Sequence, residues 1–293
     1  MQLENIARRF RIDHPHKFKL SDHDAADCCG LTIEKAEAKM MLSEGVERLV
    51  DLQERLWASN TWSVLIVLQA MDAAGKDGVI KHVMTGLNPQ GVDVHAFKQP
   101  SKEELGHDFL WRAAKLLPER GRIGIFNRSY YEEVLVVRVH QGNLAAQNLP
   151  PAMTQKNIWK HRFHDIRSFE EHLAENGMLI VKFFLNVSKD EQRKRFFSRI
   201  DEPAKRWKFS MGDVAERKYW DDYMSAFQDV IRETSRPEAR WYVVPSDQKW
   251  FSRLVVAAAL VEAMDGLKLK YPTVKGTALK ELEKARRALK AEK

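Results

Sequence analysis

The sequence predicts an α/β fold, in which a parallel sheet is covered by helices on both faces. Apolar segments of strand length alternate with longer segments whose apolar residues have helical spacing. The segment at residues 63–69 is apolar almost throughout, which is typical of a strand buried on both faces. Small residues, then Gly75-Lys76 and a helical pattern follow it. That order is the layout of a phosphate-binding loop.

In the first two thirds of the chain, the expected elements follow one another with short connections. Apolar residues such as Val46, Leu49 and Leu56 recur at helical spacing. Gly177 ends a long helical pattern, and a polar stretch containing Pro indicates a loop. We expect helices over residues 32–58, 77–86, 103–117, 129–139 and 154–176, strands over 63–69, 92–98, 122–127 and 178–187, and a loop over 143–151.

The rest of the chain continues the alternation. Ser188 is expected to cap a helix, and Glu191, three residues on, would complete a capping box. Residues 201–211 are basic and irregular. We then expect helices over residues 213–235 and 247–267 and a strand over 241–244, which gives the sheet five strands.

No stretch rich in Gly, Ser or Pro is long enough to separate two domains, so we expect one domain over residues 1–293. Residues 1–30 carry mixed charge and several histidines with little periodicity, and we expect an N-terminal arm lying on the body. Residues 268–293 are basic and weakly helical, which indicates a solvated C-terminal helix.

The composition limits the classes of partner and compartment. A net charge of +7 implies an acidic partner, which is a nucleic acid, a membrane or a phosphorylated substrate. The apolar run over residues 254–264 is too short to span a bilayer and contains Glu262. No secretory signal is visible, and the two cysteines are adjacent, so no disulfide framework is expected. We expect a cytoplasmic protein without a membrane partner.

The loop after the first strand is the first candidate site. A phosphate can approach the backbone of its small residues closely, and the ammonium of Lys76 can reach the oxygens of a transferring phosphoryl group. The candidate residues for binding phosphate or nucleotide here are Ala73, Ala74, Gly75, Lys76 and Asp77.

Two positions depart from the usual form of such a loop. Ala70 replaces the opening Gly, which requires a negative φ there, and Asp77 replaces the Ser or Thr that binds Mg²⁺ through its hydroxyl. Asp72 is an alternative oxygen ligand for the metal. Helix capping is another explanation for both acids, and we favour it for Asp77 but not for Asp72.

A second candidate site follows the strand at residues 122–127. Asn127 ends this strand and can accept a hydrogen bond or contact a metal without adding charge. Arg128 suits a fork that binds phosphate, with a surface Arg as the alternative. Glu132 could instead be a first-turn acid favoured by the helix dipole. Lys98, at another strand end, is a candidate for a further phosphate contact.

A basic segment forms the third candidate site, at about residues 188–212, where nucleotide kinases carry a closing lid. Phosphoryl transfer needs its spread negative charge neutralised by metals and by Lys or Arg side chains. The alternative is a solvated helix with acidic neighbours. Its cations are Lys189, Arg193, Lys194, Arg195, Arg199, Lys205, Arg206 and Lys208.

With these motifs in order, the chain closely resembles the polyphosphate kinase 2 family over roughly residues 15–270. The matching stretches are residues 71–78 (Met-Asp-Ala-Ala-Gly-Lys-Asp-Gly), 107–112 (His-Asp-Phe-Leu-Trp-Arg), 126–132 (Phe-Asn-Arg-Ser-Tyr-Tyr-Glu), 185–189, 207–210, 220–224 and 241–245. Some members carry Asp-Arg-Ser-Trp-Tyr-Asn at the second motif, where this chain has Asn127 to Glu132. The version with Glu132 resembles the subgroup that phosphorylates both nucleoside monophosphates and diphosphates.

The resemblance implies a P-loop nucleotide-kinase-like three-layer fold with a helical lid. It implies reversible, Mg²⁺-assisted transfer of a terminal phosphoryl group from inorganic polyphosphate to ADP and AMP, with Mn²⁺ as a substitute. Adenine or guanine nucleotides would be partners, nucleic acids would not, and the chain would form a homo-oligomer, either dimer or tetramer.

The resemblance also assigns roles to residues. Asp72 would orient the metal or phosphate, with Asn127 beside it. Lys76 would bind phosphates, Arg128 would clamp the transferring group, and Glu132 would position the nucleotide or metal. Lid residues would guide the polyphosphate, and the candidates are Arg193, Arg199, Lys205 and Lys208.

Two alternatives stay open at this point. An ATP-dependent nucleoside monophosphate kinase would share the fold, but it predicts a conventional Gly at position 70 and a Ser or Thr at position 77. A non-catalytic, basic nucleic-acid-binding protein would predict aromatic residues interleaved with basic ones, and it leaves Asp72 and Glu132 without a role.

Overall fold

The computed structural model describes residues 3–31, 35–153 and 157–292, and it is built around a five-stranded parallel sheet. The strands are β1 (Ser63–Gln69), β2 (Val92–Ala96), β3 (Ile123–Asn127), β4 (Met178–Asn186) and β5 (Trp241–Pro245). Their order across the sheet is β2-β3-β1-β4-β5, and every pairing is parallel. The expected sheet is confirmed, with the strand that precedes the phosphate loop at its centre.

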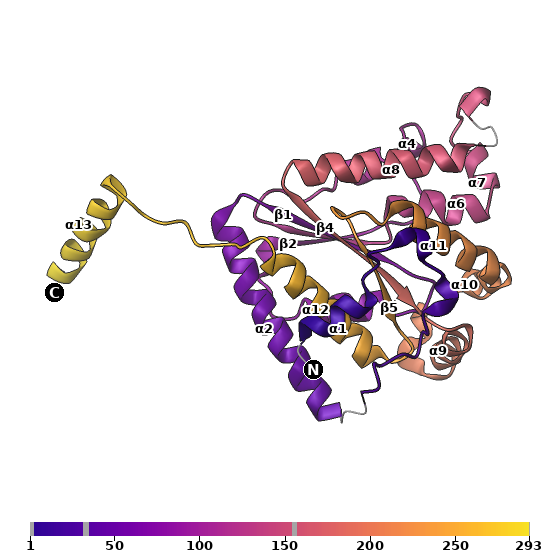
Figure 1. Ribbon diagram of the computed structural model, residues 1–293, viewed down its shortest axis with the longest axis horizontal. Helices are drawn as coiled ribbons and strands as arrows, with labels where there is room; N and C mark the ends of the chain where they lie inside the picture. Colours follow the sequence, from indigo (N-terminus) through magenta and orange to yellow (C-terminus); the bar gives the residue numbers. More distant parts are fainter. Residues whose placement is uncertain (1–2, 32–34, 154–156, 293) are drawn as a thin grey trace.

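Helices cover both faces of this sheet, so the molecule has three layers (Figure 1). On one face lie α1 (Leu3–Phe10), α2 (Lys35–Ser59), α3 (Lys76–Val83) and α12 (Lys249–Asp265). On the other lie α8 (Ile158–Glu175) and α11 (Trp220–Thr234). All seven residues of β1 are buried, as its uninterrupted apolar sequence predicts.

The N-terminal residues differ from the expected arm. Helix α1 packs against α12, and the side chains of Ile6, Ala7 and Phe10 belong to the hydrophobic core. Their spacing places them on one face of a helix, although charged neighbours hide the pattern in so short a segment. The rest of this region runs over the surface through two short 3-10 helices, η1 (Pro15–Lys17) and η2 (Leu20–Asp22).

The region between β2 and α8 is more broken than expected. The helix predicted over 103–117 is divided into α4 (Lys102–Leu105) and α5 (Trp111–Ala114), and between them the Asp108 carboxylate accepts the Leu110 N–H instead of a helix continuing. The segment 129–139 is 3-10 helix η4 (Tyr130–Val134) followed by α6 (Val136–Val139). The predicted loop over 143–151 contains α7 (Gly142–Ala145) and the start of η5 (Pro151–Met153).

Other predicted boundaries hold closely. Helix α3 lies within the predicted 77–86 apart from its first residue, and a short 3-10 helix, η3 (Pro89–Gly91), leads into β2. The predicted starts of two helices, at residues 32–34 and 154–156, lie outside the described residues.

The basic segment after β4 folds into α9 (Lys189–Asp201), η6 (Pro203–Lys208) and the start of α10 (Met211–Glu216). The Ser188 hydroxyl accepts the N–H of Glu191, as predicted. The Glu191 carboxylate, however, accepts from the Arg195 guanidinium at 2.9 Å, so the predicted capping box is only half formed. The helix predicted over 213–235 is divided into α10, η7 (Arg217–Tyr219) and α11.

After α12 the chain extends away from the body and ends in α13 (Thr277–Ala291), which projects into solvent (Figure 1). Its described side chains are exposed along the whole helix. Across the described parts of the chain, no helix has the length and apolarity needed to cross a membrane.

Candidate functional site

Three strand ends meet at the edge of the sheet where α3 begins. Leu68, near the end of β1, pairs with Asn127 of β3, which in turn pairs with Ala96 at the end of β2. The loop at residues 70–75 therefore lies beside the Asn127-Arg128 turn and the segment at residues 97–99. Ligands of open parallel sheets bind beyond such carboxyl ends.

The phosphate loop is shaped by two residues in the left-handed region. Gly75 is the N-cap of α3 with φ of +118°, a value that side chains strongly disfavour, and Ala73 has φ of +60°. Ala70 is absent from the non-glycine residues with positive φ, so alanine meets the requirement at that position. The N–H groups of the first helical turn have no partner inside a helix, so the start of α3 offers donors to an anion.

Side chains from α9 hold this loop by its carbonyl oxygens. The Gln192 amide donates to the carbonyl of Asp72 at 2.9 Å. The Arg195 guanidinium donates to the carbonyls of Ala73 and Ala74 at 3.0 and 2.6 Å. Both side chains are buried. The base of the lid and the phosphate loop therefore form one rigid unit.

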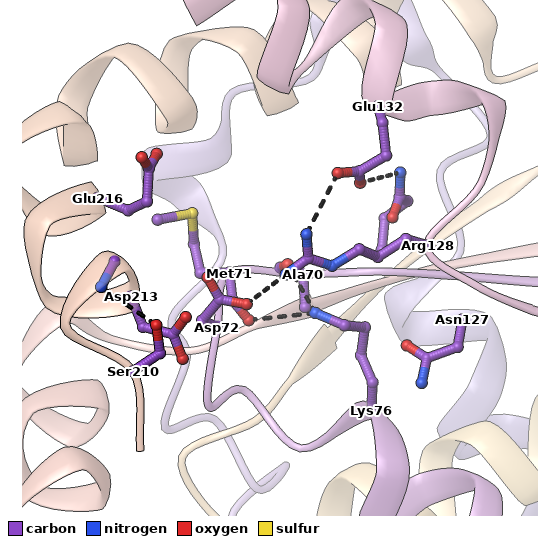
Figure 2. A network of polar contacts seen from close by, with 12 residues as sticks. Ala70, Met71, Asp72, Lys76, Asn127, Arg128, Glu132, Ser210, Asp213 and Glu216 are labelled. Carbon is purple, nitrogen blue, oxygen red and sulfur yellow. Dashed lines mark hydrogen bonds and ion pairs between the residues drawn. The ribbon is translucent and has the colours of Figure 1, made fainter. Parts of the chain in front are cut away.

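Lys76 folds back over the loop. Its ammonium donates to the carbonyls of Ala70 and Met71 at 2.9 and 3.4 Å (Figure 2). Burial, with the nearby positive charge of Arg128, lowers the pKa of Lys76 to about 8. An anion in the loop would stabilise the charged ammonium and would compete with these carbonyls for it.

Arg128 lies between two carboxylates. Its Nη2 is 2.5 Å from Asp72 Oδ1, and its Nη1 is 3.6 Å from Glu132 Oε2, so the guanidinium joins the two motifs (Figure 2). Glu132 also accepts from the Gln69 amide at 3.1 Å, and burial raises its pKa. Arg128 has φ of +63°, an uncommon value for a residue with a side chain.

A buried ionic cluster holds the turn that carries Arg128 and Glu132. Lys182 of β4 donates to Glu170 of α8 at 2.6 Å, and both side chains are almost without solvent exposure. The hydroxyls of Tyr130 and Tyr131 each donate to Glu170 at 2.8 Å. Glu170 thereby fixes the positions of Tyr130 and Tyr131, two consecutive residues of η4, beneath the site.

Two cavities meet at Arg128. The first, called the loop cavity, has a volume of about 630 Å³ and is lined by the phosphate loop, the lid and the start of α12. Its cations are Lys76, Lys98, Arg128, Arg195, Arg199, Lys205, Lys208, Lys249 and Arg253, and its acids are Asp72 and Asp77. The second cavity, of about 520 Å³, is lined by mixed aromatic, polar and charged side chains from residues 97–147 and Glu216.

The structure brings most of the sequence-predicted candidates to the loop cavity. Asp77 is largely exposed, accepts from the Asn127 amide at 3.0 Å and lies 3.9 Å from Lys208 Nζ. Gly75 rather than Asp77 occupies the N-cap position, so capping does not explain this acid. Lys98 lines both cavities with an exposed side chain. Arg193 is not brought to the cavity, because it is exposed and pairs with Asp190 on the outside of α9.

Sequence reasoning missed one acid near the loop and two cations that line the loop cavity. Asp213 of α10 pairs with Arg199 at 3.1 Å, and its pKa is raised by burial and by the charge of Asp72, which places it near the loop. Lys249 and Arg253 of α12 line the cavity. Two cations four residues apart, at the start of a largely apolar helix, were the available signal.

The side chains at the phosphate loop include oxygen ligands of the kind that Mg²⁺ prefers. Among the residues that the structure describes, no group of three or more His, Cys, Asp or Glu side chains is arranged to hold a metal. Mg²⁺ commonly keeps several waters and uses one or two carboxylates together with substrate phosphates. Asp72 at the edge of the loop fits that pattern, and the Asn127 oxygen is turned toward Lys76 and the loop (Figure 2). The residues therefore fit a metal that phosphate helps to hold.

The sequence is similar to those of known phosphotransferases. An ADP-polyphosphate phosphotransferase of Rhodopseudomonas palustris is 55% identical over 250 residues, which cover 85% of this chain and 86% of the relative. An AMP/ADP-polyphosphate phosphotransferase of Meiothermus ruber is 44% identical over 90% of this chain and 95% of its own.

The fold agrees as well. The crystal structure of polyphosphate kinase 2 from Arthrobacter aurescens TC1 matches with a TM-score of 0.87 and 41% identity, over 98% of this chain and 97% of that chain. The expected P-loop kinase-like α/β fold is thus confirmed. The model of the family described as polyphosphate kinase 2 matches residues 32–272, and the chain belongs to this family.

Proposed function

We propose that this protein transfers the terminal phosphoryl group of inorganic polyphosphate to ADP and to AMP, reversibly and with Mg²⁺. The observation that carries the proposal is the meeting of two cavities at Arg128, one strongly cationic and one of mixed character. Relatives that match nearly the whole chain are named as ADP- and AMP/ADP-polyphosphate phosphotransferases, which supports both acceptors.

The loop cavity suits polyphosphate. Its cations greatly outnumber its acids, and the loop and lid supply them from opposite sides. A linear polyanion carries charge along its whole length and needs no base-specific contacts. Lid residues Arg199, Lys205 and Lys208 face this cavity, so they are proposed to contact the chain together with Lys76.

The second cavity suits a nucleotide. Phe97 and Phe109 line it, and they offer apolar contact to a base, while Lys98 and Arg112 offer charge to its phosphates. We propose adenine and guanine nucleotides as acceptors, and competition between the two kinds of nucleotide would test this range.

The roles of the residues follow from the position of Arg128. A phosphate oxygen of the nucleotide attacks the terminal phosphorus of polyphosphate, and the bond to the bridging oxygen breaks, so that this oxygen leaves with the shortened chain. Arg128 neutralises the transferring group, and Asp72 and Glu132 orient its guanidinium. Lys76 and the start of α3 hold the donor end. A strong general base is unnecessary because the attacking phosphate is already anionic.

Asp72, with Asn127 nearby, would hold Mg²⁺ together with phosphate oxygens and water. The ion supplies neutralisation of charge on the phosphates when it is bound, and Mn²⁺ should substitute for it. Asp72 would then be shared between the metal ion and the Arg128 guanidinium, with which it is already paired.

The test is an assay for ATP with polyphosphate and Mg²⁺, using ADP or AMP as the acceptor. We expect ATP from ADP, and ADP followed by ATP from AMP. A reaction with ADP alone is the control for disproportionation of two ADP molecules. Failure to form product with either acceptor would contradict the proposal, while ATP from ADP but not from AMP would contradict only the dual acceptor range.

The ATP-dependent nucleoside monophosphate kinase is the second candidate, and it is tested by ATP and AMP without polyphosphate. The missing Gly at position 70 and hydroxyl at position 77 disfavour it. A homo-oligomer, dimer or tetramer, is also proposed, and light scattering of the purified protein would measure it.

A further inference from the structure

A third cavity adjoins the start of β5, the strand at one edge of the sheet. We call it the edge cavity, and its volume is about 370 Å³. One wall is formed by residues 12–17, which include η1, and the other by residues 235–237 together with Arg240. None of its lining residues lines either cavity at Arg128. Since the phosphate loop lies beyond the carboxyl ends of the strands, the edge cavity at the amino end of β5 is a separate place in the fold.

Positive charge predominates in the edge cavity. Its permanent cations are Lys17, Arg236 and Arg240, and its one acid is Asp13. The Asp13 carboxylate is already shared, because its Oδ1 lies 2.9 Å from Arg240 Nε and 3.0 Å from Arg11 Nε. In the parts of the chain that the structure describes, neither Lys17 nor Arg236 has a carboxylate partner. Two cations therefore face the cavity without a counter-charge, and an anion would supply one.

The other lining groups narrow the class of ligand. The rings of His14 and His16 can each donate a hydrogen bond from a nitrogen. Among the described residues, no Phe, Tyr or Trp side chain lines the cavity, so it lacks the ring on which a nucleotide base commonly stacks. The donors come from two separate segments of the chain. A small anion with several oxygens can contact both segments, which favours inorganic phosphate or pyrophosphate.

The wall of the edge cavity is continuous with the buried cluster beneath the active site. Ser235 lines the cavity, and the carbonyl of the preceding Thr234 accepts from Lys182 Nζ at 2.8 Å. The N–H of Trp241 donates to the Ser235 hydroxyl at 3.2 Å, and its ring centroid lies 4.9 Å from that of Tyr131. An anion that orders this wall should therefore also order the cluster that holds η4.

We propose that the edge cavity is a second anion site, which binds inorganic phosphate or pyrophosphate and stabilises η4, the segment that carries Glu132. Lys17 contacts the anion from the N-terminal segment, and Arg236 contacts it from the turn before β5. The Ile12 N–H already donates to the Trp241 carbonyl at 2.9 Å, so the anion adds a second link between the same two segments. The site goes beyond the proposed function, because none of its residues takes part in the transfer.

The test is hydrogen exchange of the full chain, followed by mass spectrometry, with increasing phosphate or pyrophosphate. In the wild type, exchange should slow in peptides that contain Ile12, Trp241 and η4. Hydrogen bonds to charged groups are strong, so the double variant Lys17→Gln with Arg236→Gln should need at least about tenfold more anion for the same protection. Pyrophosphate should act at a lower concentration than phosphate, because it can contact both segments at once.

Two controls separate this site from other effects. Lys19→Gln, an exposed lysine that does not line the cavity, should keep the protection of the wild type. Arg236→Lys keeps the charge and should recover part of the protection, which shows that the loss is not a failure to fold. Anion bound in the loop cavity is seen separately, in peptides over residues 70–78, and the double variant should leave that signal unchanged.

Each outcome bears on one part of the proposal. Protection at Ile12 and Trp241 that is equal in the wild type and the double variant would overturn the site, as would protection confined to residues 70–78. Protection of the cavity wall without any in η4 would overturn the link to the active site. A wild type that forms no ATP from polyphosphate but shows the expected protection would contradict the proposed function alone.

Discussion

The ammonium of Lys182 lies 2.6 Å from the Glu170 carboxylate inside the core, with side-chain exposures of 0% and 2%. This pair also binds the tyrosines that precede Glu132. It lies beneath the turn on which Arg128 adopts its positive φ. The backbone that aims Arg128 at Asp72 is thus supported by a buried charge pair from a different strand and helix.

Breaking the Lys182–Glu170 pair should lower the stability of the fold. Glu170→Gln leaves the Lys182 charge buried without its partner, and the free energy of unfolding should fall by about 3–5 kcal/mol. Urea denaturation measures the change. The double variant Lys182→Met with Glu170→Leu removes both charges and should lose less than the single variant. A single variant as stable as the wild type would show that the pair does not hold the turn.

Arg128 is expected to matter for turnover more than for folding. Arg128→Ala removes the charge that we propose neutralises the transferring group, so kcat should fall about 10²- to 10³-fold. Arg128→Lys keeps the charge but loses the planar fork that reaches Asp72 and Glu132 together, so it should recover only part of the activity. Steady-state kinetics measures both, and Arg286→Ala in the exposed α13 serves as the control. Full activity in Arg128→Lys would show that simultaneous contact with Asp72 and Glu132 is not required.

The pKa of Lys76, about 8, predicts a pH effect on donor binding. Below this pKa the ammonium is charged and attracts polyphosphate, and above it the free enzyme loses that charge. The value of kcat/KM for polyphosphate, which reports on the free enzyme, should therefore decrease as the pH rises through about 8. Lys76→Arg keeps its charge and should lack this decrease. A profile that is the same in both proteins would assign the decrease to another group.

Arg195 is expected to be a positioning residue for the phosphate loop. Arg195→Met leaves buried carbonyl oxygens of the loop without donors, so the free energy of unfolding should fall by about 1–3 kcal/mol. The KM for polyphosphate should rise as the loop becomes less ordered. Arg193→Met, on the exposed side of the same helix, should change stability by less than about 0.5 kcal/mol. The activity of Arg193→Met also tests whether Arg193 guides polyphosphate, as the sequence suggested.

Much of the fold could be predicted because its signals are local. The largely apolar sequences of β1 and β4, the latter interrupted by Lys182, and Gly75 at the start of α3 each favour one kind of backbone. The broken helices after β2 and β3 could not be predicted in this way. There, Arg112 of α5 donates to the carbonyl of Lys98, and Tyr131, in the turn after Arg128, donates to Glu170. These elements depend on contacts with residues distant in the sequence rather than on periodicity.

In the candidate site, too, some residues could be predicted from local sequence and others depend on distant contacts. Asp72, Lys76 and Arg128 follow strand ends, and strand ends of a parallel sheet come together whatever the details of the fold. Arg195 was visible only as one of many cations, because its partners are carbonyl oxygens that no sequence pattern marks. Lys249 belongs to a helix at the opposite end of the chain, so only the folded molecule places it beside the loop.

The attachment of α9 to the loop has a mechanical consequence. Gln192 and Arg195 belong to the first two turns of the helix, and their bonds to the loop would have to break if the whole helix tilted. Bending beyond Arg195 breaks none of them. The tip that carries Lys205 and Lys208 can therefore bend as a short hinged flap on a fixed base. If polyphosphate binds as proposed, this flap would open for a long chain while the phosphate loop that holds its end stays in place.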